Sequence, residues 1–353
     1  MKSEPSILHI VESIDKAAVE NWLIGILGHS TLSSFNHVVF CQLPGDDHKI
    51  KSLPSYVQVI VAKNGVGTLK YLYEINRVIR EFKIGIVHSH HDVMTGWYWL
   101  AGLRRKWIWH FHNCDYHYVT DSHLKRNCLR ILSYVGLAFA WKIIGISKAV
   151  QQDFTSKGFP WEMEVVNYGF SWVNETSAPA AERKGKLKCI YLGRLNKNKN
   201  VEFLLELWNG VKLESVAELD IYGAGELVDT VKDFCSSESN VRYCGWSSDA
   251  LSTMRQYDVL LFPRKPEQPE GFGIVLLEAM ENGIFIVSSP YITEELHAYP
   301  RMKLLPLELS KWIDHIIHLS TKPAEPTPDI RDFLNCFHAD FCASSIKRVY
   351  LND

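Results

Sequence analysis

The stretch EGFGIVLLEAM, residues 270–280, places two glycines between a carboxylate and an apolar run. The run after Gly273 has no Gly or Pro as far as Glu281, so it predicts a buried helix that begins near Gly273. Glu270 then lies in the loop before the helix, and Glu278 lies just over one turn inside it. A helix N-terminus presents unpaired N–H groups and a partial positive charge, and glycine lets a phosphate approach closely. Taken alone, the stretch fits either a packed helix after a tight turn or a site that binds a phosphorylated ligand.

The composition is that of a globular protein long enough for two domains. The chain has 353 residues, of which 46% are hydrophobic and 22% charged, with a net charge of -2. This charge argues against a dedicated nucleic-acid binder, and we expect no nucleic-acid partner. The first 170 residues hold 11 of the 15 histidines.

The cysteines and the hydropathy pattern indicate a cytoplasmic location. The eight cysteines form no Cys-x-x-Cys pair, which suits reduced thiols better than a disulfide framework or a zinc site. The first residues do not resemble a signal peptide, and no apolar run approaches the ~20 residues of a membrane span. We therefore expect a cytoplasmic protein.

Short apolar segments alternate with helical patterns, which indicates parallel sheets with helices on both faces. The alternation runs from Ile7 to Lys157 and restarts at Cys189. The polar residues 174–186 between the two runs have little to bury and predict a linker. We predict an α/β chain with an N-terminal domain at 1–173, a linker at 174–186, a second domain at 187–335, and a C-terminal helix at 336–353 that packs back on the first domain.

Glycines and basic residues follow successive predicted strands of the second domain, where open α/β sheets bind their ligands. The four segments are Gly193-Arg194-Leu195 with Lys199, Gly223-Ala224-Gly225-Glu226, Gly245-Trp246 and Pro263-Arg264-Lys265. Glycine permits close approach, and an arginine and a lysine can together neutralise a diphosphate. Each segment alone is compatible with a solvated turn, but their succession before Glu270 favours a ligand site.

In order and spacing, these segments with Glu270 and Glu278 resemble the GT4 family of retaining glycosyltransferases. The similarity spans most of residues 189–290. It implies a GT-B fold, in which two Rossmann-like domains face each other across a cleft and the second binds a nucleotide-sugar. The N-terminal domain would then bind the acceptor.

The resemblance also implies roles for individual residues. Arg194 and Lys199 would hold the donor diphosphate, Glu270 would bind hydroxyls of the transferred sugar, and Glu278 would bind the ribose hydroxyls. The other implied donor-binding residues are Gly193, Gly223, Gly225, Gly245, Gly271, Phe272, Gly273, Ile274 and Val275. Members of the family usually need no metal for the chemistry, and the chain has no Asp-x-Asp motif, so we expect no cofactor and no metal ligand.

The first domain matches the family less completely. His110-Phe111-His112-Asn113 resembles a His-x-His-Asn segment, which implies that His112 positions or polarises the donor sugar, with His110 and Asn113 as further candidates. Glu20 corresponds to a glutamate of the family's N-terminal loop, although the two glycines that often precede it are replaced here.

Histidines 88, 90 and 91 could suggest a metal cluster, but no carboxylate or cysteine lies at a supporting spacing. We therefore predict no metal site from the sequence.

Aromatic and basic residues cluster between 97 and 109. The helix predicted over 94–104 and the following strand carry several tryptophans together with Arg104, Arg105 and Lys106, and Lys125, Arg126 and Arg130 join this cluster. Such a mixture suits either a peripheral contact with an anionic membrane at the inner face of the cell or a core-facing helix with a charged edge.

The resemblance thus implies a retaining glycosyltransferase. It would move a sugar from a UDP- or GDP-linked donor to a hydroxyl of a glycan or lipid-linked saccharide during cell-surface polysaccharide or glycoconjugate assembly. The alternatives are a nucleotide-sugar epimerase or hydrolase on the same fold and a non-catalytic partner subunit. A nicotinamide-dependent oxidoreductase is disfavoured because no Gly-x-Gly-x-x-Gly follows the first strand.

Overall fold

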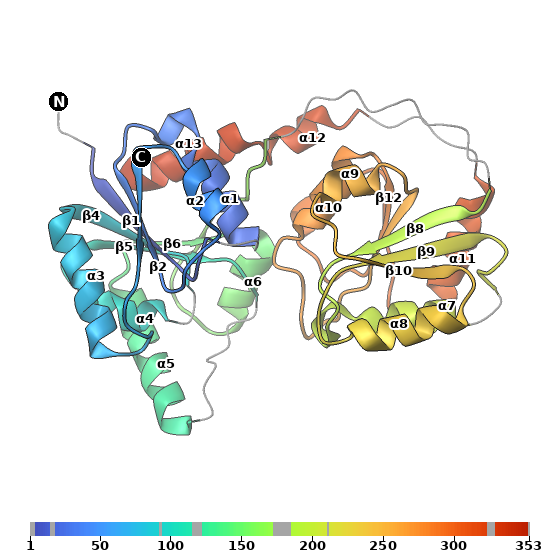
Figure 1. The fold of residues 1–353 in the computed structure, drawn as a ribbon, viewed down its shortest axis with the longest axis horizontal. Coiled ribbons are helices and arrows are strands. Elements are labelled where there is room, and N and C mark those ends of the chain that lie inside the picture. The colour runs from blue at the N-terminus through green and yellow to red at the C-terminus, as the bar shows by residue number, and fades with distance from the viewer. Residues whose placement is uncertain are drawn as a thin grey trace. The chain divides into compact units, whose positions relative to one another are not determined.

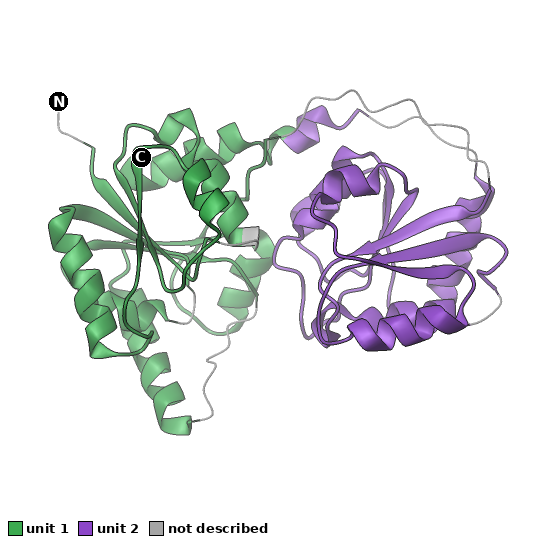
Figure 2. Cartoon of the chain, in the orientation of Figure 1, with its two compact units in different colours: residues 1–171, 335–353 green, residues 172–334 purple. Residues whose placement is uncertain are grey.

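The computed structural model describes residues 4–14, 18–91, 94–114, 122–171, 185–209, 212–322 and 329–351. The chain forms two compact units, each built on one sheet (Figures 1 and 2). Unit 1 comprises Met1–Ser171 and Asn335–Asp353, and unit 2 comprises Trp172–Leu334. Most of the predicted linker at 174–186 lies outside the described residues.

Unit 1 has a seven-stranded sheet in the order β3-β2-β1-β4-β5-β6-β7, and all its strand pairs are parallel. The order reverses direction between β1 and β4, which is where open α/β sheets form a ligand crevice. The strands are β1 (Ser6–Val11), β2 (His37–Cys41), β3 (Val57–Val61), β4 (Ile84–Ser89), β5 (Lys106–Phe111), β6 (Lys142–Gly145) and β7 (Glu164–Val165).

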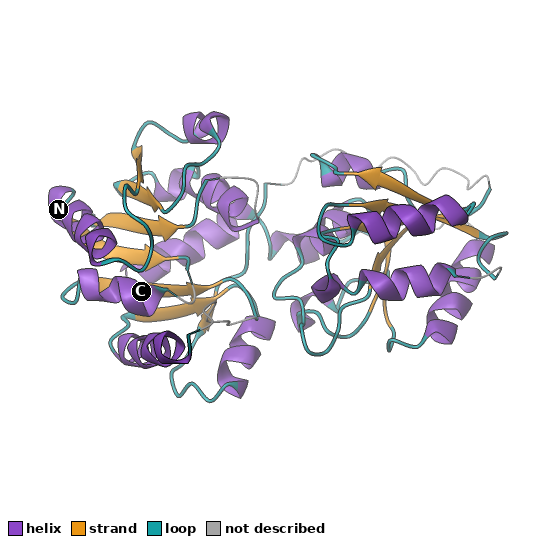
Figure 3. Ribbon diagram, turned by 60° about the horizontal axis from the view of Figure 1, so that its bottom comes forward, coloured by secondary structure: helices purple, strands orange, loops and turns teal. Residues whose placement is uncertain are grey.

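Helices cover both faces of this sheet (Figure 3). They are α1 (Ala18–Leu27), η1 (Ser30–Leu32), α2 (Asp47–Ser52), α3 (Leu69–Glu81), α4 (Thr95–Tyr98), η2 (Trp99–Ala101), α5 (His123–Ala138), α6 (Lys148–Ser156) and α13 (Ala339–Leu351). Side-chain caps fix several starts: the hydroxyls of Thr68, Ser122 and Ser147 accept backbone N–H bonds from the first turns of α3, α5 and α6. The C-terminal α13 packs against α1 and η1.

Unit 2 repeats the design with a six-stranded parallel sheet in the order β10-β9-β8-β11-β12-β13. The strand order changes direction between β8 and β11, as it does between β1 and β4 in unit 1. The strands are β8 (Leu187–Leu192), β9 (Ala217–Tyr222), β10 (Val241–Gly245), β11 (Val259–Phe262), β12 (Phe285–Ser288) and β13 (Met302–Leu304).

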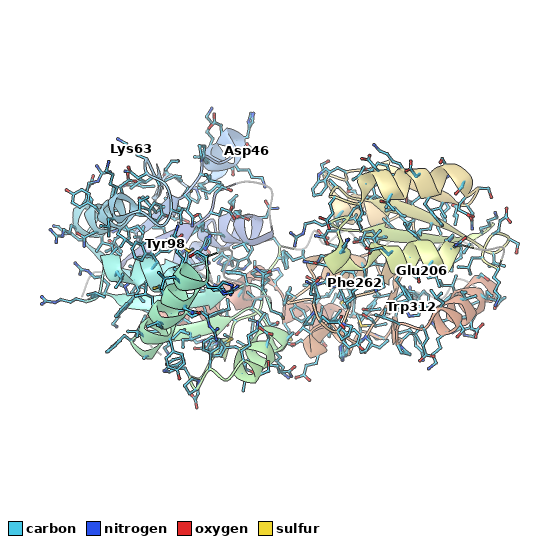
Figure 4. The ribbon with its side chains drawn as sticks, turned by 90° about the horizontal axis from the view of Figure 1, so that it is seen from below. Asp46, Lys63, Tyr98, Glu206, Phe262 and Trp312 are labelled. Atoms are coloured by element: carbon cyan, nitrogen blue, oxygen red, sulfur yellow. The ribbon has the colours of Figure 1, made fainter. Side chains whose placement is uncertain are left out.

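The helices of unit 2 also lie on both faces of its sheet. They are η3 (Lys197–Lys199), α7 (Val201–Trp208), α8 (Val228–Ser237), α9 (Ala250–Met254), α10 (Ile274–Glu281), η4 (Glu294–Leu296) and α11 (Leu309–Thr321), while the short α12 (Arg331–Asn335) leads back to unit 1. Figure 1 shows α7 and α8 on one face and α9 and α10 on the other. The core on the α7 side buries Trp208 and Trp312 completely, and Figure 4 shows Trp312 on α11 and Phe262 at the end of β11.

The helix predicted over 94–104 is shorter in the structure. It consists of α4 and the 3-10 turn η2, and it ends before Gly102, whose backbone leaves the helical region. Gly96 lies so close to α5 that a Cβ there would come within 2.5 Å of the Ser133 backbone nitrogen. The neighbouring aromatic residues Trp99 and Trp107 are buried, so the aromatic part of the predicted surface cluster is core.

Among the described residues, no helix is both long enough and apolar enough to span a membrane.

Candidate functional site

The loop after β8 is held in a fixed shape by backbone hydrogen bonds to the neighbouring strand end. Leu195 donates its N–H to the carbonyl of Ala224 at 2.8 Å, and the Tyr191 hydroxyl donates to the carbonyl of Arg194 at 2.9 Å. The Asn196 side chain accepts the N–H of Lys199 at 3.1 Å and starts η3. The loop therefore presents Arg194 on the surface and holds Lys199 half-buried.

Two glycines allow this loop to lie against the end of β9. Gly223 and Gly225 have φ values of +152° and +151°, where L side chains are strained. A Cβ on Gly223 would come within 1.9 Å of the Gly193 carbonyl oxygen, and one on Gly225 within 2.3 Å of that of Leu195. The Gly-x-Gly pattern therefore serves close packing of two backbone segments and shapes the predicted donor loop indirectly.

The predicted residues Lys199 and Glu270 meet at the point where the strand order reverses. Lys199 Nζ lies 2.5 Å from Glu270 Oε2 in a largely buried ion pair. Arg264 Nε lies 3.4 Å from the same oxygen. The Arg264 guanidinium also donates to the carbonyls of Asn198 and Gln268 at 2.6 Å each, so it joins the loop after β11 to the loop after β8.

The charges around Glu270 are predominantly positive. Burial alone would raise the pKa of Glu270, but Lys199, Arg264 and Arg194 outweigh it and hold that pKa below its ordinary value. Burial, together with the neighbouring Arg264 and Arg194, lowers the pKa of Lys199, although its pairing with Glu270 acts in the opposite direction. Three cations therefore surround one carboxylate, and this excess positive charge favours an anionic ligand.

The start of α10 lies beside this cluster, as the sequence predicts. Gly273 caps the helix with φ +79°, and a Cβ there would come within 3.2 Å of Glu270 Cγ. Gly271 and Phe272 are buried, whereas Ile274 and Val275, the first two helical residues, are half-buried. Gly245, another predicted donor-binding residue, ends β10 with φ +77° and open space around its α-carbon.

Glu278 lies in the second turn of α10 and is half-buried. Burial, reinforced by the charge of Asp249, raises the pKa of Glu278 from 4.5 to about 7. The folded protein therefore binds a proton at this carboxyl more tightly than the unfolded chain does. The stabilisation is complete below about pH 4.5, falls as the pH rises, and is lost above about pH 7.

Glu278→Gln is expected to remove this pH dependence, because an amide does not ionise. The thermal midpoint of the variant should exceed that of the wild type above about pH 7, and the difference should shrink toward about pH 4.5. Thermal unfolding of both chains across this window measures the effect. Glu281→Gln on the same helix is the matched control and should give a smaller gain, since Glu281 is more exposed to solvent. A wild-type midpoint with no dependence on pH in this window would contradict the assignment.

The predicted histidines of unit 1 belong to a hydrogen-bonded chain inside the domain. It links the Leu32 carbonyl to His37, His9, His90 and His112, with ring nitrogens 3.1 Å apart at each step, and ends at the Tyr168 hydroxyl, 2.6 Å from His112 Nδ1. Because the carbonyl only accepts, His37 Nε2 carries a proton, and by succession each ring donates from Nε2. Burial lowers the pKa of His112 to about 3, so its ring is neutral at physiological pH.

Both ring nitrogens of His112 are thus engaged within unit 1. It can contact a sugar only by releasing Tyr168 or His90. His110 pairs with His88 through Nδ1 at 3.1 Å, and its Nε2 is buried with no hydrogen-bond partner among the described residues. Asn113 is exposed just after β5. Glu20 lies buried in the first turn of α1, so it belongs to a helix and not to a loop.

Sequence reasoning missed Arg264 as a member of the site. The Pro263-Arg264-Lys265 segment drew attention only as a basic strand end. A signal was present nonetheless, because Arg264 lies two residues after β11, which borders β8 at the reversal of strand order.

Comparison with known proteins identifies both halves of the chain. The protein-family model described as Glycosyltransferase Family 4 matches residues 33–171. The family model described as Glycosyl transferases group 1 matches residues 186–320. Together the two matches cover more than two thirds of the chain.

A curated relative and several solved structures are similar over most of their length. The capsular polysaccharide biosynthesis glycosyltransferase CapH of Staphylococcus aureus is 24% identical over 297 residues, which cover 79% of this chain and 80% of CapH. Anabaena Alr3699/HepE, solved with UDP-glucose, has a TM-score of 0.73 at 17% identity and covers 99% of this chain and 100% of its own. The lipopolysaccharide outer core galactosyltransferase WaaB, in its apo form, has a TM-score of 0.72 at 18% identity, covering 98% and 99%. The chain therefore belongs to the GT4-like glycosyltransferases, and its two Rossmann-like units are those of the GT-B fold.

Proposed function

We propose that this glycosyltransferase moves a sugar, with retention of anomeric configuration, from a UDP- or GDP-linked donor to a hydroxyl of a glycan or lipid-linked saccharide. The main support is the cluster of Arg194, Lys199 and Arg264 around Glu270, which carries excess positive charge at the reversal of strand order in unit 2. The names of its relatives CapH and WaaB favour an acceptor in cell-surface polysaccharide assembly. We place the reaction in the cytoplasm.

In the proposed mechanism the enzyme stabilises the departing nucleoside diphosphate, because negative charge develops there as the sugar leaves. Arg194 and Lys199 neutralise the diphosphate, and Glu270 binds hydroxyls of the transferred sugar. The acceptor attacks on the face from which the diphosphate departs, and a phosphate oxygen takes its proton. Under this proposal the chemistry uses protein cations where other transferases use a metal.

A thermal-shift screen with nucleotide sugars tests the donor. UDP-glucose and other UDP-sugars, GDP-sugars and matched ADP-sugars should be compared at equal concentration. A donor present at about 100 times its dissociation constant adds about 2.7 kcal/mol of stability, which raises the midpoint by several degrees. The Arg194→Ala chain should lose that shift. No shift with any UDP- or GDP-sugar would contradict the proposal, and donor consumption that no acceptor accelerates would favour an epimerase or hydrolase.

We further propose that unit 1 contacts an anionic membrane surface through α5. This helix projects from the body of unit 1 in Figure 1 and exposes Leu124 and Ile131 beside Lys125 and Arg130. Arg126 is half-buried on the same helix, and the exposed Phe139 directly follows its last residue. Arg104, Arg105 and Lys106 of the same unit are also exposed. Exposed apolar side chains mixed with cations match the chemistry of a membrane interface.

Reversal of three charges on α5, in the chain Lys125→Glu with Arg126→Glu and Arg130→Glu, is expected to weaken liposome binding roughly a hundredfold. Each basic residue near an anionic surface contributes about 1 kcal/mol, and the effect should diminish at high salt. Co-sedimentation with vesicles containing anionic lipid measures it.

The matched control reverses three exposed charges on another helix of the same unit, Lys70, Arg77 and Arg80 on α3. This chain has the same net charge as the α5 variant. Equal binding by the two triple variants would rule out a specific role for α5.

A further inference from the structure

Five buried histidines meet at the reversal of strand order in unit 1. His9 lies in β1, His88 in β4 and His110 in β5, while His90 and His112 directly follow those last two strands. Residues two apart on a strand point to the same face, and these strands are neighbours, so the imidazoles stack. The ring centroids of His110 and His112 lie 4.0 Å apart, and those of His88 and His90 lie 4.2 Å apart.

Three of these histidines bring ring nitrogens together at the outer end of the cluster. One nitrogen each from His90, His110 and His112 lies within 4.8 Å of the other two. His90 Nδ1 and His112 Nε2 are already 3.1 Å apart. Two imidazole nitrogens bound to one tetrahedral zinc ion at about 2.0–2.1 Å lie about 3.3 Å apart. Small side-chain shifts would therefore complete a three-nitrogen site.

The unpartnered atom in this group points to a ligand. His110 is almost fully buried, and its Nε2 has no hydrogen-bond partner among the described residues. A buried polar nitrogen without a partner is costly, and a bound ion would satisfy it.

We propose that His90 Nδ1, His110 Nε2 and His112 Nε2 bind one divalent transition-metal ion of the Zn²⁺ and Co²⁺ class. Neutral imidazole suits these ions, and three histidines on adjacent strands leave a fourth position for water. His90 and His112 are the most exposed members of the cluster, at 7% and 4%, and both directly follow their strands, so this position faces the carboxyl edge of the sheet. All three ligands come from unit 1, so the site does not require a bound donor.

Each ligand already has a partner for its other ring nitrogen. His90 Nε2 pairs with His9 Nδ1, His110 Nδ1 with His88 Nε2, and His112 Nδ1 with the Tyr168 hydroxyl. Such outer partners fix the tautomer and orientation of metal-bound histidines. For metal binding, the His112 proton moves from Nε2 to Nδ1 and is donated to the Tyr168 oxygen, and the His110 proton resides on Nδ1 and is donated to His88 Nε2. Each of the two imidazoles keeps one proton and stays neutral.

A second group, His9, His88 and His90, also has ring nitrogens within 4.8 Å of one another. Every ring nitrogen in that group already has a hydrogen-bond partner. A metal ion bound by His9, His88 and His90 would break more of these histidine hydrogen bonds than one bound by His90, His110 and His112 would. The outer group is therefore the site.

Titration of the full chain, without a polyhistidine tag and after chelator treatment, with Co²⁺ and then Zn²⁺ tests the proposal. Wild-type protein should bind one Co²⁺ per chain, with the intense visible absorption of a four- or five-coordinate ion, and Zn²⁺ should displace it. Zn²⁺ should also raise the thermal midpoint. Wild-type protein that binds no stoichiometric ion would overturn the proposal without touching the donor site.

Variants then locate the ion. His88→Gln removes the hydrogen-bond partner of a ligand and should weaken metal binding about 10- to 100-fold. His110→Gln and His112→Gln each remove a ligand and should weaken metal binding by more than about a hundredfold. His48→Gln, an exposed histidine on α2, should bind as the wild type does. Circular dichroism checks the fold of each variant, and if His110→Gln does not fold, His112→Gln decides. Undiminished affinity in a folded ligand variant would refute the assignment.

Discussion

The Lys199→Ala chain is expected to turn over about a hundredfold more slowly than the wild type, with its fold intact. Lys199 forms a largely buried 2.5 Å pair with Glu270, next to the predicted position of the donor diphosphate. Its loss removes a preorganised cation at the point where the leaving group acquires charge. The fold should survive because Arg264, 3.4 Å from the same carboxylate, keeps Glu270 paired. Release of nucleoside diphosphate from the donor with the largest thermal shift, under saturating conditions, measures turnover.

Lys197→Ala is the matched control for this prediction. Lys197 lies in the same 3-10 turn, carries the same charge and is exposed to solvent. Its loss should leave turnover within about twofold of the wild type, since isolated surface charges contribute little. Glu270→Ala should lower turnover about as much as Lys199→Ala does. If Lys199→Ala and Glu270→Ala both retained wild-type turnover, the cationic cluster could not be the donor site.

Much of the architecture was predictable because it depends on local patterns. Strand and helix segments alternate along the chain, and this alternation indicated two parallel sheets with helices on both faces, which the structure confirms. The helix that follows Gly273 begins at Ile274, as the glycines at 271 and 273 before the apolar run predict. The helix predicted over 94–104 was too long, because it continued past Gly102, where the backbone leaves the helical region and where glycine commonly ends a helix.

The candidate site was predictable only where its residues form ordered motifs. Lys199 and Glu270 were identified from family spacing, and the structure brings them together. The position of Arg264 after a predicted strand was visible in the sequence, but its contact with a residue 66 positions away was not. The contact of Tyr168 with His112, 56 positions away, was likewise not visible in any local pattern. The histidine cluster was missed for the same reason. His90, His110 and His112 come from neighbouring strand ends, so a search for nearby cysteines or carboxylates could not find their geometry.

The Gly223→Ala chain is expected to lose about 4 kcal/mol of stability in unit 2. The backbone at φ +152° disfavours alanine, and the new Cβ would lie 1.9 Å from the Gly193 carbonyl oxygen. Strain of about 1–3 kcal/mol is joined by loss of backbone hydrogen bonds worth about 1 kcal/mol each, such as that from Gly193 N–H to the Tyr222 carbonyl. Urea unfolding of the full chain measures the change.

Gly245→Ala separates the clash from the backbone strain, and so makes this prediction specific. Gly245 also has a positive φ, +77°, but a Cβ there meets no atom within 4 Å. Alanine at this position should therefore cost only the left-handed penalty of about 1–2 kcal/mol. The excess loss in Gly223→Ala then reports displacement of the loop that carries Lys199, and the nucleotide-sugar thermal shift should disappear with it. Equal destabilisation by the two substitutions would mean that the loop yields to a methyl group, and Gly223 would then be required for its backbone angle alone.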